Sequence, residues 1–265
     1  MQLTMLGTGN AAVTRCYNTC FVISTPEGHI LVDGGGGNTL LQRFEAAGLR
    51  WQDMRHIILT HRHIDHLLGI VWMLRFILQG MSRGNYEGEA YIYAHDECAE
   101  LLRSLCEQLL LPKECAFIDK RLHIVTVSDG EQRQLLGREF CFYDLGSTKA
   151  KQFGFSTELE SGRLFCCGDE PCPERLKEAV RGSKWLLHEA FCLKSQADVF
   201  KPYQKNHSTA ADAGALAEEL GVENLLLYHT EDKNIERRKE LYTAEAKEHF
   251  SGRVFVPEDL EIIEL

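Results

Sequence analysis

Residues 60–66 read Thr60-His61-Arg62-His63-Ile64-Asp65-His66 and place three imidazoles and one carboxylate within six residues. An apolar run typical of a strand, 56–59, precedes this motif, and an apolar run typical of a helix, 67–74, follows it. Imidazole and carboxylate groups are ligands for zinc, iron and manganese. Crowded into one strand-to-helix turn, they would repel one another as protons bind unless a metal organised them. The motif therefore predicts a metal site, and the alternative is a histidine-rich surface loop that binds nothing.

The composition narrows the class of protein. The chain has 265 residues, 44% hydrophobic and 26% charged, which is ordinary for a globular protein with a sizeable core. A net charge of −10 argues against a protein that wraps nucleic acid through a broad basic face. The ten cysteines show no paired C-x-x-C spacing and no secretory leader follows Met1, so we expect free thiols and a cytoplasmic location. The longest apolar run, 67–78, is too short for a membrane span and contains Arg75, so no membrane partner is expected.

Short β-rich runs alternate with longer helical ones, and no linker or repeat divides the chain. The expected strands are 3–6, 20–24, 29–33, 57–60, 90–94, 122–127, 139–144, 163–167, 185–188, 224–228 and 254–256. The expected helices are 39–47, 66–79, 96–110, 173–181, 209–220 and 236–248. Hairpin-type strands dominate the beginning and the middle, and strand–helix alternation dominates the end. This pattern predicts an α+β (mixed α/β) architecture in one domain over residues 1–265, with two packed sheets covered by helices on both outer faces.

Polar side chains also follow three other apolar strands. Asp169 comes after the run 164–167, His188 closes the run 185–187, and His229 comes after the run 225–228. Sites of α/β architectures lie beyond the carboxyl ends of strands, so residues that are distant in the sequence can converge there. We expect these side chains to lie near the histidine motif.

Seven motifs, spread over nearly the whole chain, carry a resemblance to a known family. They are Leu6-Gly7-Thr8-Gly9-Asn10 with Arg15 and Asn18, Ile30-Leu31-Val32-Asp33-Gly34-Gly35, the 60–66 motif in the form T-H-x-H-x-D-H, Cys167-Gly168-Asp169, His188-Glu189-Ala190-Phe191, His207-Ser208-Thr209 and Leu227-Tyr228-His229-Thr230. In this order and spacing the chain resembles the metallo-β-lactamase superfamily, and within it the ribonuclease Z branch.

The resemblance implies a four-layer αββα metallo-β-lactamase sandwich with two divalent metal ions, zinc by expectation and manganese or iron as alternatives. It implies that His61 and His63 hold the first metal. It assigns Asp65, His66 and His229 to the second metal and makes Asp169 the bridge between them. Two such ions can share a water, lower its pKa and stabilise a developing oxyanion, so a metal-bound hydroxide would be the nucleophile. Asp65 would both bind a metal and orient that nucleophile.

One position departs from the family pattern. The family supplies a third imidazole to the first metal, and the corresponding position here is Gly146; no histidine lies between His123 and His188. Three outcomes stay open: a water completes a weaker first site, Asp144 replaces the missing ligand, or only the second metal binds. The first is our hypothesis, and a Gly146→His variant should then raise the metal content.

The remaining motifs imply further roles. By the resemblance, His207 is the general acid that protonates the leaving oxygen, since an imidazole carries and releases a proton near neutral pH. Ser208 and Lys205 would contact the substrate, although a helix cap and a solvated lysine are the structural alternatives. His188 and Glu189 would support His207 or His229, and the alternative is a polar pair that closes a strand.

The leading functional hypothesis is hydrolysis of a small or cyclic phosphodiester. Folded tRNA is not expected as a partner, because the segment 155–169 leaves no room for the tRNA-gripping arm of ribonuclease Z. The alternatives are a hydrolase of thioesters, lactones or other carboxylic esters, and a metal-impaired binding protein without catalysis. A diiron oxidoreductase is less well supported because His63 stands where those proteins carry glutamate. A homodimer is expected, as in similar proteins.

Overall fold

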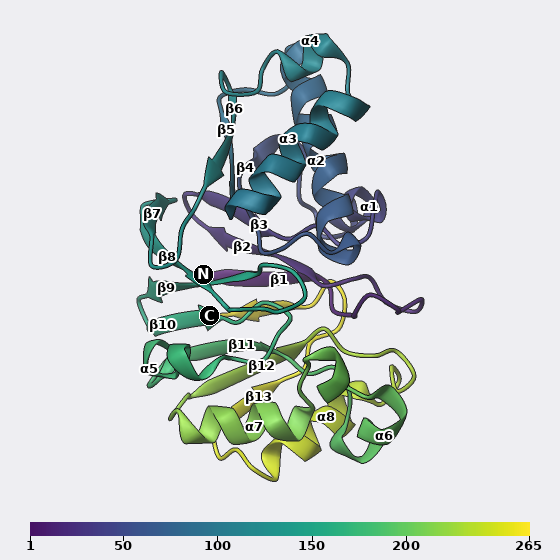
Figure 1. The fold of residues 1–265 in the computed structure, drawn as a ribbon, viewed down its shortest axis with the longest axis vertical. Helices are drawn as coiled ribbons and strands as arrows, with labels where there is room; N and C mark the ends of the chain where they lie inside the picture. Colours follow the sequence, from purple (N-terminus) through teal and green to yellow (C-terminus); the bar gives the residue numbers. More distant parts are fainter.

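The computed structural model describes residues 1–265 and contains two seven-stranded sheets packed face to face (Figure 1). The first sheet has the order β14 (Ile262–Glu264), β1 (Gln2–Gly7), β2 (Cys20–Thr25), β3 (Gly28–Val32), β4 (Met54–Leu59), β5 (Ala90–Ala94) and β6 (Leu122–Thr126). The second has the order β13 (Arg253–Phe255), β12 (Asn224–Tyr228), β11 (Trp185–Glu189), β10 (Gly162–Cys166), β9 (Phe153–Leu159), β8 (Arg138–Asp144) and β7 (Gln132–Leu135).

Helices cover the outer face of each sheet, in the upper and lower layers of Figure 1. The upper layer contains α1 (Thr39–Ala46), α2 (Ile64–Arg83), α3 (Asp96–Leu109) and α4 (Pro112–Cys115), with the 3-10 turn η1 (Trp51–Asp53). The lower layer contains α5 (Lys177–Val180), α6 (Ala197–Phe200), α7 (Ala210–Glu219) and α8 (Arg238–Lys247), with the turns η2 (Glu174–Leu176), η3 (Lys194–Gln196) and η4 (Tyr203–Lys205). The predicted αββα sandwich is confirmed.

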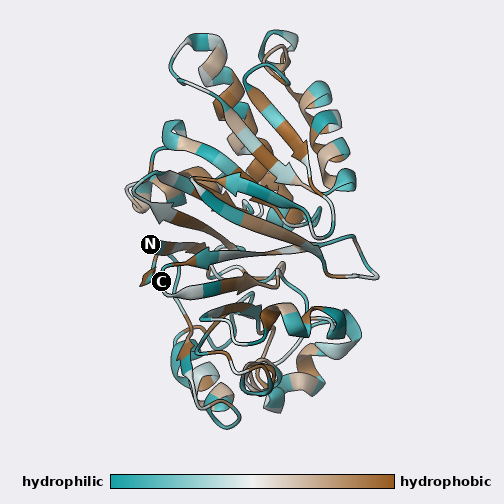
Figure 2. Cartoon of the chain, turned by 90° about the vertical axis from the view of Figure 1, so that its left-hand side faces the viewer, coloured by the Kyte–Doolittle hydropathy of each residue, from teal (hydrophilic) through white to brown (hydrophobic).

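Three apolar layers hold the sandwich together. Between the sheets, alternate residues of facing strands interdigitate, among them Phe21, Phe142 and Phe155. The other face of each sheet packs against its own helices. Both faces of the central strands are therefore buried, which explains why residues 225–228 of β12 form a continuous apolar run rather than an alternating one. Figure 2 shows these hydrophobic stretches in brown along the strands of both sheets.

The direction of the strands positions the site. In the first sheet β3–β6 run parallel, and in the second sheet β10–β13 run parallel. The remaining pairs are antiparallel hairpins or the β1–β14 edge. The carboxyl ends of β4, β10, β11 and β12 all carry the polar residues that the sequence singled out. Loops from both sheets thus meet at one edge of the sandwich.

Helix α2 is long and apolar enough, by length and composition, to cross a membrane. However, 61% of its most apolar stretch is buried inside the protein. Its inner residues, such as Ile70, Leu74 and Ile77, are fully buried against the first sheet. The apolar character of α2 is therefore used by the core.

Three strands and three helices differ from the sequence prediction. The four-residue helices α4 and α6 were not predicted. Strands β7, β9 and β14 were not predicted, and the helix expected at 173–181 is a 3-10 turn followed by the single turn α5. β7 is mostly exposed and polar, and β14 is a three-residue edge strand, so neither carries a clear apolar period. They form because their backbones pair with β8 and β1.

Candidate metal centre

The histidine motif forms the turn between β4 and α2. His61 and His63 lie in the loop, and Asp65 and His66 belong to the first turn of α2. Asp169 follows β10 and His229 follows β12. The structure brings these side chains together at one edge, and all but the half-buried His63 are buried.

Four groups of converging donor atoms occur at this edge, and two of them consist of the six ligands predicted from the sequence. The other two groups are Asp33, His61 and His66, and Glu189, His207 and His229. In the first group of predicted ligands, His61, His63 and Asp169 place one donor atom each within 4.8 Å of one another. His61 Nε2 and His63 Nδ1 are 2.9 Å apart. The second group consists of Asp65, His66 and His229, again within 4.8 Å.

Asp169 lies between the two groups. Its Oδ2 atom is 3.4 Å from His61 Nε2, 3.4 Å from His229 Nε2 and 3.6 Å from His66 Nε2. Asp65 Oδ2 is 3.5 Å from the Nε2 atoms of both His66 and His229. One carboxylate oxygen thus faces imidazoles of both groups, as a bridging ligand must.

Several donor atoms at this edge have no partner within the protein. His66 Nε2 and both ring nitrogens of His229 are buried without a hydrogen bond. Burying polar atoms without partners is costly, so native proteins rarely leave several together. A divalent cation coordinated by Nε2 atoms and carboxylate oxygens would satisfy them, and the residues present therefore fit a metal centre.

Burial and neighbouring charges shift the pKa values of the site residues in opposite directions. Burial alone would lower the pKa of His66, but the carboxylates of Asp65 and Asp33 outweigh it and raise that pKa well above its usual range. Burial would raise the pKa of Asp65 and Asp169, yet the surrounding imidazoles hold both pKa values below their usual range. Burial, with His61 beside it, lowers the pKa of His63 to about 4. The carboxylates are therefore ionised and ready to bind a cation.

Asp33 supports the motif from β3. Its Oδ1 accepts a hydrogen bond from Thr60 N (2.8 Å), and its Oδ2 accepts from Thr60 Oγ1 (2.7 Å) and pairs with His66 Nδ1 (2.8 Å). This fixes the ring so that Nε2 faces the centre. Asp33 and His229 both have positive φ, 56° and 58°. Such conformations are uncommon for residues other than glycine, and they concentrate at functional sites.

The glycine run after Asp33 allows a close backbone contact. Gly34 N donates to His66 O (2.8 Å) and Gly69 N donates to Gly35 O (2.9 Å). A Cβ atom added to Gly69 would lie 1.7 Å from Gly34 O. The first turn of α2, which carries Asp65 and His66, can therefore approach the β3 loop only because both positions lack side chains.

A cavity of about 560 Å³ opens above the centre. His63, Asp65, Asp169 and His229 contribute to its floor. Its other lining residues are Asn10, Ala11, Ala12, Arg62, Ile64, Phe191, Lys205 and His207.

The ring of His207 is stacked against Phe191 with centroids 4.6 Å apart, and it lies 5.3 Å from the ring of His229. Its Nδ1 is 3.6 Å from Glu189 Oε2 and has no hydrogen bond. The ammonium group of Lys205 lies 4.8 Å above the ring centre of Phe191.

The structure places two of the predicted site residues away from the cavity. Ser208 does not line the cavity: its backbone N and its hydroxyl (2.5 Å) both donate to Glu189 Oε1. His188 points to the other side of β11, where its Nε2 accepts from Cys172 N (3.3 Å), so only Glu189 reaches His207. Successive strand residues face opposite sides, and a polar pair therefore cannot serve one site.

Asp144 Oδ1 accepts from Gly146 N (2.8 Å), and Asp144 belongs to no group of converging donor atoms. Gly146 itself is exposed, has φ of 70°, and has no atom within 4 Å of an added Cβ. Instead, Gln152 lies buried against Asp169, and its Nε2 donates to Asp169 Oδ1. Gln152 belongs to none of the motifs that the sequence singled out.

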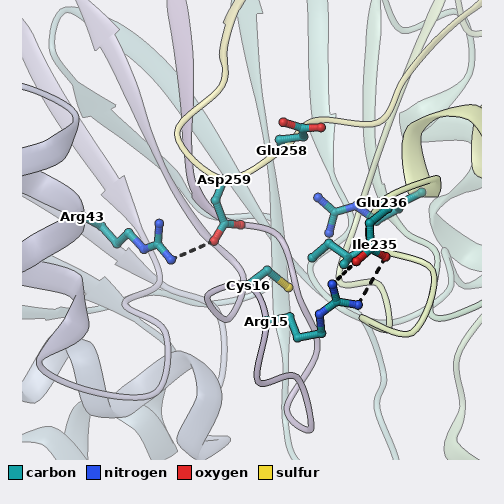
Figure 3. Close-up of a pocket in the computed structure, with 8 residues that line it drawn as sticks. Arg15, Cys16, Arg43, Ile235, Glu236, Glu258 and Asp259 are labelled. Carbon is teal, nitrogen blue, oxygen red and sulfur yellow. Dashed lines mark hydrogen bonds and ion pairs between the residues drawn. The ribbon is translucent and has the colours of Figure 1, made fainter.

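A second cavity, of about 340 Å³, lies where the N-terminal loop meets the C-terminal segment (Figure 3). Its arginines are already paired: Arg15 with Glu236, and Arg43 with Asp259 (3.1 Å). The buried Arg238 donates to Thr8 Oγ1 (2.8 Å) and Thr230 Oγ1 (3.1 Å). These contacts hold the loop after β1 against Thr230, which follows His229. The arginines around this cavity therefore stabilise the fold and are not free to bind an anion.

Comparison with known proteins agrees with this geometry. Ribonuclease Z of Pseudomonas putida KT2440 is 28% identical over 313 aligned positions, which cover 98% of this chain and 96% of that protein. The metallo-β-lactamase fold protein YhfI from Bacillus subtilis superposes with a TM-score of 0.81 at 17% identity, over 100% of this chain and 99% of that chain. Human tRNase Z, short form, superposes with a TM-score of 0.72 at 19% identity, with the same coverage.

A family model described as "Anti-Pycsar protein Apyc1" matches residues 1–248. It covers the whole candidate centre, from Asp33 to His229. The predicted membership of the metallo-β-lactamase superfamily, in its ribonuclease Z-like branch, is confirmed. The chain belongs to the Apyc1 family of metallo-β-lactamase-fold proteins.

Proposed function

We propose that this protein is a metal-dependent hydrolase that cleaves a small or cyclic phosphodiester. The observation that carries the proposal is the floor of the 560 Å³ cavity, where two groups of His and Asp donor atoms meet at Asp169 beneath His207 and Lys205. The ribonuclease Z relatives, whose name denotes cleavage of RNA, support a phosphodiester as the scissile group.

Two divalent ions are proposed, with Zn²⁺ as the first candidate because imidazole dominates the donor set and with Mn²⁺ or Fe as alternatives. His61 and His63 would hold one ion, Asp65, His66 and His229 the other, and Asp169 both. When bound, such ions lower the pKa of water and neutralise negative charge that develops on a phosphoryl oxygen.

The side chains of the protein supply the remaining steps. Asp65 Oδ2 faces the centre and can accept a hydrogen bond from an attacking water, which orients that water. His207 stands at the wall of the cavity and can deliver a proton to the departing oxygen. Its stacking on Phe191 and the nearby Glu189 carboxylate fix the position of the ring. Lys205 and Arg62 line the same cavity and would attract the phosphate.

The size of the cavity favours a small substrate. About 560 Å³ is in the usual range for small-molecule pockets. Strands β9 and β10 are joined by a turn of two residues, so no arm extends from this hairpin to grip a folded tRNA. A net charge of −10 further disfavours a polyanionic RNA.

The experiment compares four substrates on protein that has been stripped with a chelator and reloaded with zinc or manganese. We expect hydrolysis of bis(p-nitrophenyl) phosphate and of cyclic nucleotides, and much slower hydrolysis of an acyl thioester and of a lactone. A preference for the thioester or lactone would overturn the substrate class. Absence of metal-dependent turnover on all four, in protein shown to contain metal, would overturn hydrolysis and favour a binding protein.

We also propose one domain over residues 1–265, a cytoplasmic location and a homodimer. All ten cysteines are free thiols, which fits a reducing compartment. A second copy would cover apolar side chains that α2 and the end of α3 leave exposed, among them Ile64 (68% exposed) and Leu109 (60%). Light scattering after gel filtration tests the dimer, and a mass of 30.1 kDa would contradict it.

A further inference from the structure

The two groups of donor atoms at the centre are unequal. Apart from the shared Asp169, the second group offers the Asp65 carboxylate and the imidazoles of His66 and His229. The first group offers only His61 and His63. With Asp169 counted in both groups, the second offers four protein ligands and the first offers three, which is the number in a catalytic zinc site. Harder cations such as Mn²⁺ use more ligands, mainly oxygen atoms. The first group is thus the one that a further oxygen ligand would complete.

Gln152 is a buried polar side chain that contacts Asp169, the residue shared by the two groups. It is 1% exposed, and its Nε2 donates to Asp169 Oδ1. The other oxygen of the same carboxylate, Oδ2, faces His61, His66 and His229. The side-chain hydrogen bond of Gln152 is made by Nε2, and no donor of the protein reaches its Oε1.

The backbone holds Gln152 in register with the metal motif. Leu145 N donates to Gln152 O (2.8 Å), which closes the loop between β8 and β9. Phe153 N donates to Thr60 O (3.0 Å), directly before His61. A Cβ atom added to Gly168 would lie 2.6 Å from Gln152 Nε2, so the glycine beside Asp169 makes room for the carboxamide.

Other oxygen ligands near this loop are already engaged. Asp144 accepts from Gly146 N, and Glu170 Oε1 accepts from Ser147 Oγ (2.7 Å). Lys149 Nζ lies 4.0 Å from the same Glu170 oxygen. Neither carboxylate belongs to a group of converging donor atoms.

We propose that Gln152 is a ligand of the first metal, which it binds through Oε1 while its Nε2 orients Asp169. This inference rests on the metal centre of the proposed function. A carboxamide oxygen is a neutral, hard donor, unlike the imidazoles around it. It therefore makes the first position weaker for Zn²⁺ and comparatively better for Mn²⁺ than an imidazole would.

The experiment titrates metal-free protein with Zn²⁺ and, separately, with Mn²⁺ in a calorimeter. Wild type is expected to take up two ions, one tightly and one more weakly. Gln152→Leu replaces the carboxamide, with its C=O and NH₂, by an apolar group of similar size. The affinity for the more weakly bound ion should fall at least tenfold, and the affinity for the tightly bound ion should not change. Gln152→His should tighten Zn²⁺ at the weaker position and raise its selectivity for Zn²⁺ over Mn²⁺ by about tenfold.

Gln134→Leu, at an exposed position of β7, is the matched control and should bind both ions as wild type does. Thermal melts of each metal-free variant separate loss of binding from loss of folding, and Gln152→His keeps the test decisive if Gln152→Leu fails to fold. If wild type, Gln152→Leu and Gln152→His bind each of the two ions with the same affinity, Gln152 is not a metal ligand. The metal centre itself would still stand. Absence of any bound ion in wild type would overturn the metal centre, and with it the proposed function.

Discussion

Asp33 shows how one side chain can organise a centre that it does not line. Its two oxygens engage the backbone and hydroxyl of Thr60 and the far side of the His66 ring. Because Thr60 precedes His61, a single carboxylate sets the direction of both groups of donor atoms. Outer partners of this kind typically change metal affinity by 10–100-fold when they are replaced.

Asp33→Asn should therefore weaken metal binding by about 10–100-fold without removing any proposed ligand. The amide places an N–H where His66 Nδ1 now finds an acceptor, so the ring is no longer held. Calorimetric titration of metal-free protein measures this, with the half-exposed Asp53→Asn as control. Unchanged affinity in Asp33→Asn would show that packing alone orients His66.

The proposed proton donor can be tested through the leaving group. His207→Gln should lower kcat by about 10²–10⁴-fold for an alkyl leaving group, which needs a proton as it departs. It should lower kcat far less for p-nitrophenolate, which leaves as an anion. Metal content should stay at the wild-type level, because His207 is not among the proposed metal ligands. Equal losses for both leaving groups would contradict a role in proton delivery.

Most of the centre could be predicted from residue order, and Gln152 could not. His61, His63, Asp65 and His66 are adjacent in the sequence, and the strand ends before Asp169 and His229 are visible as apolar runs. The contact between Gln152 and Asp169 depends on how the loop 145–152 folds back, which no periodicity encodes. The contacts of Ser208 and His188 could not be predicted for the same reason, since a motif gives neighbouring residues but not the direction of each side chain.

At the scale of elements, the approach of α2 to the β3 loop decides where half of the centre lies. Gly69→Ala would place a methyl group 1.7 Å from Gly34 O, so the helix must move. We expect a loss of about 1–3 kcal/mol in the free energy of unfolding and a weaker second metal position. Urea denaturation and metal titration measure these effects. Gly37→Ala, which meets nothing within 4 Å, is the control and should change neither.

The start of α7 gives an acid-sensitive contribution to stability. Thr209 caps the helix, and Asp212 accepts hydrogen bonds from Thr209 N (3.0 Å) and Tyr203 Oη (2.7 Å). Burial alone would raise the pKa of Asp212, but these hydrogen bonds outweigh it and lower the pKa below its usual value. Because the pKa is about 3.9 in the unfolded chain, the stabilisation is present above about pH 4 and is lost as the pH falls through the lower, folded-state pKa.

Asp212→Asn should therefore destabilise the protein by roughly 0.5–1 kcal/mol at pH 7 and by progressively less below about pH 4. Urea denaturation across this pH range checks the sign, with the fully exposed Asp198→Asn as a flat control. A difference between wild type and Asp212→Asn that grows toward low pH would contradict this account.

The elements that the sequence predicts well are those with buried, regular apolar runs. The ranges expected at 90–94 and 224–228 match β5 and β12 to the residue. β9 escaped prediction although most of it is buried, because Gly154, Ser156 and Thr157 interrupt its apolar run. Its pairing with β8 and β10 stabilises it, and that information is not local.

For the whole molecule, metal loading should raise thermal stability. At a free metal concentration of 100 times the dissociation constant, one site adds about 2.7 kcal/mol. For a chain of this size that corresponds to a rise of about 5–10 °C in Tm. We expect one cooperative transition with and without chelator, in agreement with one domain, and scanning calorimetry measures both quantities. Two separate transitions, or the same Tm with and without chelator, would contradict the prediction.

The proposed ligands come from both layers of the sandwich: His61 to His66 follow a strand of one sheet, whereas Asp169 and His229 follow strands of the other. Ions bound there would link the two halves of the molecule at this edge, in addition to the side-chain packing and the few hydrogen bonds that join them elsewhere. Release of one ion and binding of another would require the two sheets to separate slightly at this edge. Mutations that make this edge more rigid should thus slow both the exchange of ions and unfolding. The rate of metal exchange and the rate of unfolding would then depend on the same motion of the two sheets.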